Sequence, residues 1–294
     1  MKSIEITFTV GASTLPTGVI SMDDAIVALY CLCDDFLRST RHRDDPQRLM
    51  TDAEVMTTAL VAALYFGGNL EAARRLLDAP SYVPTMLSKS RLNRRLHAAQ
   101  PRLRQLFDRL AEGWKRQHAS DEYVIDSFPV PVCDNIRIRR CRLIRDEAYR
   151  GYMASKRRFF YGLKAHLLVT TDGHPIECFF SPGSMADVST LPCFAFDLPP
   201  GSRVYADAAY THYDEEDLLE EAAEIRLCAA RRKNSTRPIP PWEAYWRDSM
   251  RKTIETTISV IQQRFPKTIH AVTLGGFVMK LLLFVLAHSV AALL

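Results

Sequence analysis

The sequence predicts an α/β protein in which an all-helical N-terminal module precedes a mixed five-stranded sheet flanked by helices. Three observations support this prediction. Helical periodicity fills residues 21–118, strand-like apolar runs begin at residue 121, and strands then alternate with helices towards residue 294. With 294 residues, of which 47% are hydrophobic and 24% charged, the chain has the composition of a folded globular protein with a substantial core.

The N-terminal helices carry start signals. The helical pattern begins at SMDDAIVALYCLCDDFL, where Ser21 can cap the helix, so we expect residues 1–20 to be a peripheral extension. A second helix, TDAEVMTTALVAALYF, opens with Thr51 and has Glu54 three residues later, which is a capping box.

The last pair of predicted N-terminal helices is basic. It lies in SKSRLNRRLHAAQPRLRQLFDRLAEGWKRQ and includes Arg94 and Arg95. Several short helices ending in a basic pair are typical of a helical DNA-binding module, which we assign to residues 21–118. A solvated face on a helical bundle explains the same charges equally well. Residues 119–294 then form the second domain.

That second domain contains five strand-like runs. EYVIDSFPVPV is the first, and YGLKAHLLVTTDGHPIECFFSPG gives two more around Asp172 and Gly173, a strong hairpin signal. SRVYADAAY and EIRLCAARR are the fourth and fifth, separated by the acidic helix DEEDLLEEAAE. A loop rich in Pro, Trp and Arg then leads to RKTIETTISVIQQRF, where Ile254, Ile258 and Ile261 recur at the spacing of one helix face.

The stretch GFVMKLLLFVLAHSVAALL is about as long as a membrane span, but Lys280 and His288 interrupt it. We therefore predict a buried helix that packs on the sheet. The seven cysteines form no C-x-x-C and no cluster with zinc spacing, and the start of the sequence has no signal-peptide pattern. We expect reduced thiols and a cytoplasmic protein with no membrane partner.

Three carboxylates lie in or beside these apolar elements. Asp126 is in the middle of the first strand, Asp207 is at the end of the fourth, and Glu255 is at the edge of the apolar helix face. A buried ionised carboxylate is costly unless it is paired or binds a metal. A central first strand with the fourth strand parallel beside it places Asp126 near Asp207, where a divalent cation offsets their repulsion and Glu255 supplies a third ligand. Two-metal phosphoryl transfer needs such a site.

Spacing alone leaves other acids open. Asp121, Asp134 and Glu243 are rivals, because a single strand Asp or helical Glu is commonly a turn, edge or solvated residue. Asp187, in SPGSMADVS, is a further acid near the sheet, and for it we favour an Asx turn or helix cap over a role in the site.

Two basic segments flank the predicted site. Residues 134–166 carry ten Lys and Arg against three acids, with five aromatic residues, and RRKNSTR adds four basic residues and no acid. Basic side chains neutralise phosphates and aromatic rings stack on unpaired bases, so a nucleic-acid partner explains both segments better than ordinary solvated loops do. We predict DNA contacts from Arg137, Arg139, Arg140, Lys156, Arg157, Arg158, Lys164, Arg231, Arg232 and Lys233.

Other chemistries lack their motifs. The sequence has no G-x-S-x-G, no H-E-x-x-H, no G-x-G-x-x-G and no Walker loop. A serine hydrolase, a zinc hydrolase of that type and a nucleotide-driven enzyme are therefore disfavoured.

The segments VIDSFPVPVC, RRFFYGLKAHLLVTTDGHP, SPGSMADVSTL, VYADAAY and RKTIETTISVIQQRF occur in this order, after LMTDAEVMTTALVAALYFGGN and MLSKSRLNRRLH. Together they resemble the DDE-type insertion-sequence transposases, which have an RNase H-like catalytic domain, and most closely the insertion sequence 982 family. The resemblance covers nearly the whole chain beyond about residue 21. Each motif is weak by itself, but their order makes the likeness specific.

The resemblance implies that Asp126, Asp207 and Glu255 are both the catalytic and the metal-binding residues. It implies two Mg²⁺ or Mn²⁺ ions, endonuclease and strand-transfer activity, and double-stranded DNA as partner, in the form of terminal inverted repeats and target DNA. It also implies a homodimer on DNA and a cytoplasmic, nucleoid-associated location.

Arg251 matches the arginine of the family's tyrosine-arginine-glutamate-lysine signature, which implies a DNA contact. Gln262 and Asp248 stand where that signature has lysine and tyrosine, so the DNA-contact roles of those two positions are in doubt. Two alternatives stay open: a metal-dependent nuclease without strand transfer, and a domesticated DNA-binding protein with an inactive catalytic domain. The presence of all three acids argues against the inactive form.

Overall fold

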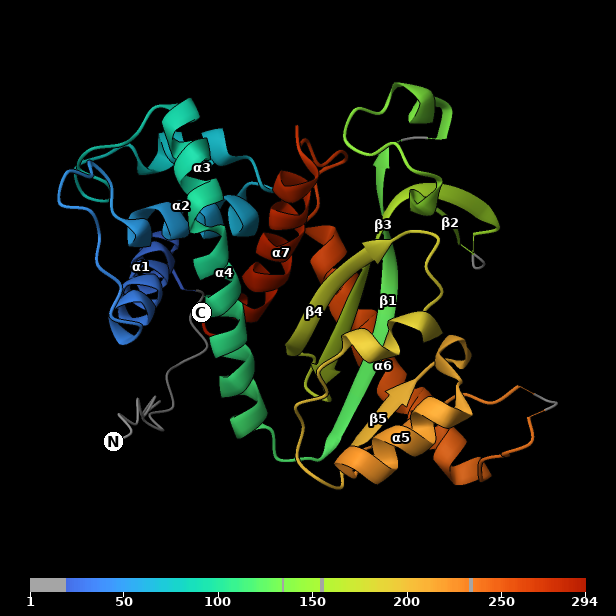
Figure 1. Ribbon diagram of the computed structural model, residues 1–294. Helices are drawn as coiled ribbons and strands as arrows, with labels where there is room; N and C mark the ends of the chain where they lie inside the picture. The colour runs from blue at the N-terminus through green and yellow to red at the C-terminus, as the bar shows by residue number, and fades with distance from the viewer. Residues whose placement is uncertain (1–19, 134, 154–155, 233–234) are drawn as a thin grey trace.

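The computed structural model describes residues 20–133, 135–153, 156–232 and 235–294 (Figure 1). Its first part is helical, as predicted. Within the described ranges it contains α1 (Met22–Ser39), α2 (Asp52–Tyr65), α3 (Leu70–Leu77) and α4 (Lys89–Gln117). The expected peripheral extension, residues 1–20, lies outside the described residues except for Ile20.

The first two helices begin at the predicted caps. Ser21 Oγ accepts the N–H of Asp24 at 3.1 Å. Thr51 and Glu54 form a reciprocal capping box, in which the Thr51 N–H donates to Glu54 Oε2 at 2.6 Å. These contacts satisfy N–H groups that a helix start otherwise leaves unpaired.

α4 is one continuous helix of 29 residues, where the sequence predicted a pair. Pro101 lies inside it and removes one backbone hydrogen bond. A row of buried side chains runs past the proline, including Leu96, Leu103 and Phe107. Packing along this face therefore holds both halves of the helix in line.

The second part of the chain forms a mixed sheet. Its strands are β1 (Glu122–Cys133), β2 (Arg150–Met153), β3 (Arg158–Thr170), β4 (Pro175–Pro182), β5 (Arg203–Ala206) and β6 (Arg226–Ala229). The order is β2-β3-β1-β5-β6, and β4 also pairs with β3. β3 is antiparallel to β1, β2 and β4, whereas β5 is parallel to β1 and to β6.

The prediction of a mixed sheet flanked by helices is confirmed, but the prediction of five strands is wrong. The described sheet has six strands. The additional strand is β2, which lies in the basic segment and pairs with the start of β3. It is four residues long and has no apolar alternation, so the sequence pattern did not reveal it.

β1 contains Pro129 and Pro131 and still extends to Cys133. β5 pairs only with the first three residues of β1, Glu122 to Val124, so the rest of β1 has an open edge on that side. Proline is tolerated at such an edge because it has no N–H to donate. Asp126 consequently lies just beyond the point where the parallel neighbour ends.

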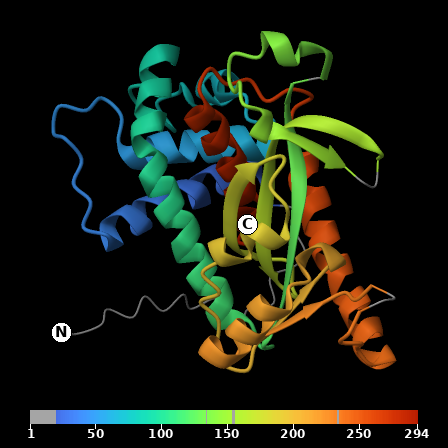
Figure 2. The same ribbon diagram turned by 45° about the vertical axis from the view of Figure 1, so that its right-hand side comes forward.

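In the described part of the chain, three further α-helices pack around the sheet: α5 (Tyr213–Ala223), α6 (Pro241–Gln263) and α7 (Leu274–Ala291). α5 contacts β6, and α6 contacts β1 and β5. Figure 2 shows α4 and α6 on opposite sides of the strands. Among the described residues, the connections hold four short 3-10 helices, η1 (Asn135–Arg140), η2 (Glu147–Tyr149), η3 (Val188–Cys193) and η4 (Ala208–Tyr210).

α6 begins earlier than the sequence indicated. The segment predicted as a loop rich in Pro, Trp and Arg forms its first turns, and Pro241 is its first residue. Proline fits there because the N–H groups of the first turn have no partner within the helix.

α7 has the length and hydropathy of a membrane span, but 67% of it is buried inside the protein. It packs against α2, α4 and β4. Its buried side chains belong to the same hydrophobic cluster as those of α2 and β1. A single core therefore runs through the helical part and the sheet, and α7 packs as the buried helix that was predicted.

Candidate active site

Two of the predicted acids lie level with each other where β5 ends. The parallel register pairs Val124 with Tyr205, so Asp126 and Asp207 follow at the same height two residues later. Asp207 comes directly after β5, and its carboxylate accepts the N–H of Ala209 at 2.7 Å. This contact caps η4 and fixes the Asp207 side chain beside β1.

Burial and nearby negative charge both raise the pKa of Asp126. Burial raises this pKa to about 7, although the N–H of Ser127 donates to Asp126 Oδ1 at 2.7 Å and so lowers it. The charge of Asp207 raises the pKa further, whereas the charge of Arg251 lowers it. Asp126 is therefore an acid whose ionised form needs a nearby positive charge.

Glu255 lies at the rim of this group. Ile254 and Ile258, on the same helix, are buried against the sheet as predicted, while the Glu255 side chain is 59% exposed. Arg251 Nη2 donates to Glu255 Oε1 at a long 3.5 Å. The structure thus brings Asp126, Asp207 and Arg251 together and places Glu255 next to Arg251.

The rival acids have other surroundings. Glu243 is buried in α6 and forms an ion pair with Arg226 at 3.2 Å. Asp121 is exposed just before β1, and Asp134 lies outside the described residues.

A fourth acid lies at the site although the sequence analysis favoured a turn or cap for it. Asp187 precedes η3, but its side chain makes no capping hydrogen bond. Instead, Asp187 Oδ1 accepts hydrogen bonds from Ser127 Oγ at 2.7 Å and from Lys164 Nζ at 3.0 Å. Its charge also acts on Asp126 and raises the pKa of that acid.

Tyr210, at the end of η4, is a further residue that the sequence did not single out. Its side chain is fully buried, and its hydroxyl lies next to the Ser127 side chain. Burial raises the pKa of Tyr210 well above its ordinary value, and the charges of Asp187 and Asp126 raise it further. Ser127, Asp187 and Tyr210 lie far apart in the sequence, and the fold brings them together here.

The donor set fits a hard divalent cation. Asp126 and Asp207 offer carboxylate oxygens, the ligands that Mg²⁺ and Mn²⁺ prefer. Glu255 is the predicted ligand that stands furthest out, because its side chain faces solvent.

A different cluster, His42, Asp44 and Asp52, brings three possible metal ligands within 4.8 Å of one another. Asp52 there forms ion pairs with Arg95 at 2.6 Å and with Arg48 at 3.0 Å. Burial by itself would raise the pKa of Asp52, but these arginines lower it. The negative charge is already neutralised, so this cluster is better explained as an ion-pair network that joins α2 to α4.

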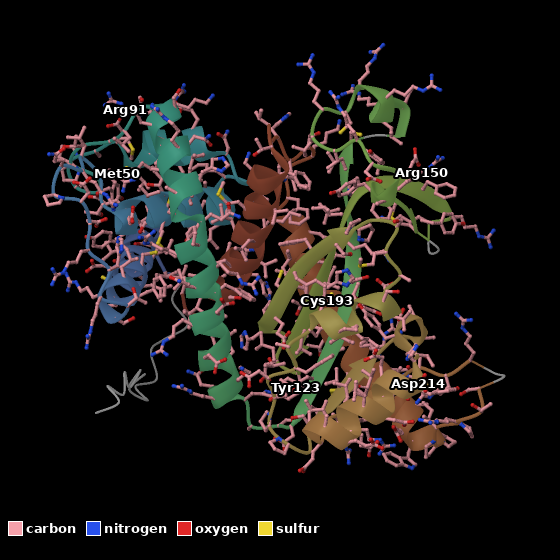
Figure 3. All side chains as sticks on the ribbon, viewed as in Figure 1. Met50, Arg91, Tyr123, Arg150, Cys193 and Asp214 are labelled. Carbon is pink, nitrogen blue, oxygen red and sulfur yellow. The ribbon has the colours of Figure 1, made fainter. Side chains whose placement is uncertain are left out.

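The residues predicted to contact DNA differ in their surroundings. Figure 3 shows nitrogen-tipped side chains that project from the η1 region and from the neighbourhood of the labelled Arg150. Three predicted residues are held in ion pairs with acids of the chain, namely Arg95 with Asp52, Lys164 with Asp187 and Arg231 with Glu216. Lys233 lies outside the described residues. The exposed ones are Arg94, Arg137, Arg139, Arg140, Lys156, Arg157, Arg158 and Arg232.

Comparison with known proteins adds one match. Residues 116–266 match the family described as transposase DDE domain, which is just over half of the chain. The matched region contains all of β1 to β6 and α6, and with them every acid described above at the site. No curated protein and no solved structure matches the chain.

Proposed function

The chain belongs to the transposase DDE domain family, and we propose that it is a DNA transposase that binds insertion-sequence ends, hydrolyses phosphodiester bonds and transfers the 3′ ends to target DNA. The observation that carries this proposal is the pair of acids at the end of β5. Asp126 and Asp207 come level through the parallel register, and the pKa of Asp126 responds to the charge of Asp207.

Transposase DDE domains use divalent metals, and we propose that Asp126, Asp207 and Glu255 hold two Mg²⁺ or Mn²⁺ ions in this chain. When bound, such ions activate a water or a 3′-hydroxyl and stabilise the leaving oxygen. The Ser127 N–H orients the Asp126 carboxylate, and the Ala209 N–H orients that of Asp207. Arg251 holds Glu255 at the rim and lies close enough to the acids to contact a phosphate of the substrate.

DNA binding is supported by the exposed basic residues. η1 carries Arg137, Arg139 and Arg140, and the β2–β3 hairpin carries Arg157 and Arg158, all exposed. Such residues neutralise phosphates, so the affinity they give should fall as salt rises. We propose that this surface leads double-stranded DNA to the acids and that the helices of residues 21–118 bind the terminal inverted repeats.

The order of the sequence motifs supports membership of the insertion sequence 982 group within the DDE transposases and an RNase H-like fold for residues 119–294. Joining two ends requires both to be held at once, which supports a homodimer on DNA. A DNA substrate and reduced cysteines support a cytoplasmic, nucleoid-associated protein.

The test is cleavage of a labelled duplex that carries the element's own end, with Mg²⁺ or with EDTA. We expect Mg²⁺-dependent nicking by the wild type and a loss of more than about a hundredfold in Asp207→Asn. Binding to the end should persist in this variant, because the exposed arginines are unchanged. Asp197→Asn, which alters an exposed acid paired with Lys115, is the matched control.

The other outcomes separate the alternatives. Equal cleavage by wild type and Asp207→Asn would show that the acids are misassigned. Cleavage without joining to a target duplex would favour the nuclease, and binding without cleavage by either protein would favour an inactive DNA-binding protein.

A further inference from the structure

Ser127 connects two acids that lie on different elements. Its backbone N–H donates to Asp126 Oδ1 at 2.7 Å, and its hydroxyl donates to Asp187 Oδ1 at 2.7 Å. Side chains of neighbouring strand residues point to opposite faces, so Asp126 and Asp187 approach β1 from opposite sides. Ser127 follows Asp126 in the chain and donates a hydrogen bond to each of the two acids, so it links them.

Lys164 completes the arrangement from β3. Its ammonium donates to Asp187 Oδ1 at 3.0 Å and to the Met185 carbonyl at 2.9 Å. The side chains of Lys164 and Asp187 are only 15% and 19% exposed. Lys164 therefore fixes both the carboxylate and the backbone of the β4–η3 connection against the strand that pairs with β1.

Tyr210 supplies an independent observation on the same group. Its phenol ring is fully buried, and its hydroxyl lies next to the Ser127 side chain. Ser127 therefore lies between Asp187 and Tyr210.

Stability alone explains the Lys164–Asp187 pair poorly. A mostly buried ion pair pays a desolvation cost that often equals its attraction, so apolar residues of similar size would stabilise the fold as well. A cap role for Asp187 is also absent, since its side chain makes no capping bond. What the pair does achieve is a fixed position for the Asp187 carboxylate, which accepts the Ser127 hydroxyl next to Asp126.

We infer that Asp187 is a positioning residue of the active site, which acts through Ser127 to orient the Asp126 carboxylate. This inference rests on the proposed function. Asp187 need not touch the ion, because orientation of a ligand by its hydrogen-bonded neighbour is enough to change metal affinity by roughly tenfold or more.

The test measures Mn²⁺ binding to the full-length protein without DNA, by electron paramagnetic resonance of free Mn²⁺. Asp187→Asn keeps the shape of the side chain and removes its charge, and we expect it to weaken Mn²⁺ binding by about tenfold. Ser127→Ala keeps all charges and removes the hydrogen bond to Asp187, so it should weaken Mn²⁺ binding in the same direction. Asp197→Asn is the control, because it removes the charge of an exposed aspartate that is likewise paired with a lysine, Lys115.

Thermal melting without metal separates a positioning role from a folding role. We expect wild type and Ser127→Ala to melt within a few degrees of each other, so that the Ser127→Ala result stands even if Asp187→Asn folds poorly. Wild-type affinity for Mn²⁺ in both folded variants would overturn the inference and leave the proposed function intact. Absence of Mn²⁺ binding by the wild type itself would overturn both.

Discussion

Asp126 and Asp207 could be predicted as candidate site residues, because each is an acid within or directly after an apolar strand run. Ser127 and Asp187 could not, since small polar residues and loop acids are common and have many structural roles. Their relevance depends on which strand lies beside which, and on a turn that returns Asp187 to β1. The sequence thus predicts the residues that carry charge in apolar surroundings and misses those that orient them.

Asp126 should make the metal-free protein less stable as the pH rises. Its folded pKa of about 7 lies above the value of 3.8 for an unperturbed aspartate. The folded state therefore holds this proton more tightly, and the stability this gives below pH 4 is lost as the pH rises towards 7. In EDTA, Asp126→Asn should be more stable than wild type at pH 8, by at most about 4 kcal/mol.

Urea unfolding at pH 8 and pH 4 checks this expectation. The advantage of Asp126→Asn should shrink to less than about 1 kcal/mol at pH 4, where the wild-type acid is protonated in the folded state. Saturating Mg²⁺ at pH 8 should reverse the order by stabilising only the wild type. An equal difference at both pH values would show that the ionisation of Asp126 is not the cause.

At the scale of elements, long periodic segments were predictable and short or irregular ones were not. The stripe of Ile254, Ile258 and Ile261 predicted α6 correctly, because three isoleucines on one face need a core. The start of α6 at Pro241 and the existence of β2 were missed. Proline is equally common in loops, so Pro241 did not indicate a helix start. The short strand β2 is stabilised by its pairing with the edge of β3.

Ile254 links the packing of α6 to the position of Glu255, its neighbour in sequence. Ile254 is fully buried, and α6 packs against β1 and β5. Ile254→Ala should lower the free energy of unfolding by roughly 2–4 kcal/mol, and it should reduce nicking more than end binding. Ser259→Ala, at an exposed position of the same helix, is the control and should leave both nearly unchanged. Retention of full nicking by destabilised Ile254→Ala would show that Glu255 does not depend on this packing.

At the scale of the whole molecule, charge is distributed unevenly. The net charge is only +4, yet the exposed arginines of η1 stand together on one projecting region. The sequence predicted this concentration, because charge runs are visible without a structure. It did not predict that Arg95, Lys164 and Arg231 would be paired with acids, since their partners lie far away in the chain.

Arg137, Arg139 and Arg140 should therefore contribute to DNA binding through phosphate neutralisation. Replacing all three by alanine should reduce the slope of log K against log salt concentration by about 2–3, for any duplex sequence. Fluorescence anisotropy with a labelled duplex at several salt concentrations measures the slope. Arg203→Ala, an exposed arginine on β5, should leave it unchanged, and an unaltered slope in the triple variant would exclude η1 from the DNA surface.

The packing of α7 also constrains the order in which the protein can form during translation. α2 and α4 are synthesised early, but the helix that covers them together with β4 emerges from the ribosome only after the whole sheet has been made. Until then, the parts of their apolar surfaces that α7 covers stay exposed and depend on chaperones or on transient contacts. The early helices therefore reach their final state only when α7 arrives, so a nascent chain that stops before Leu274 has neither a finished helical part nor a finished sheet.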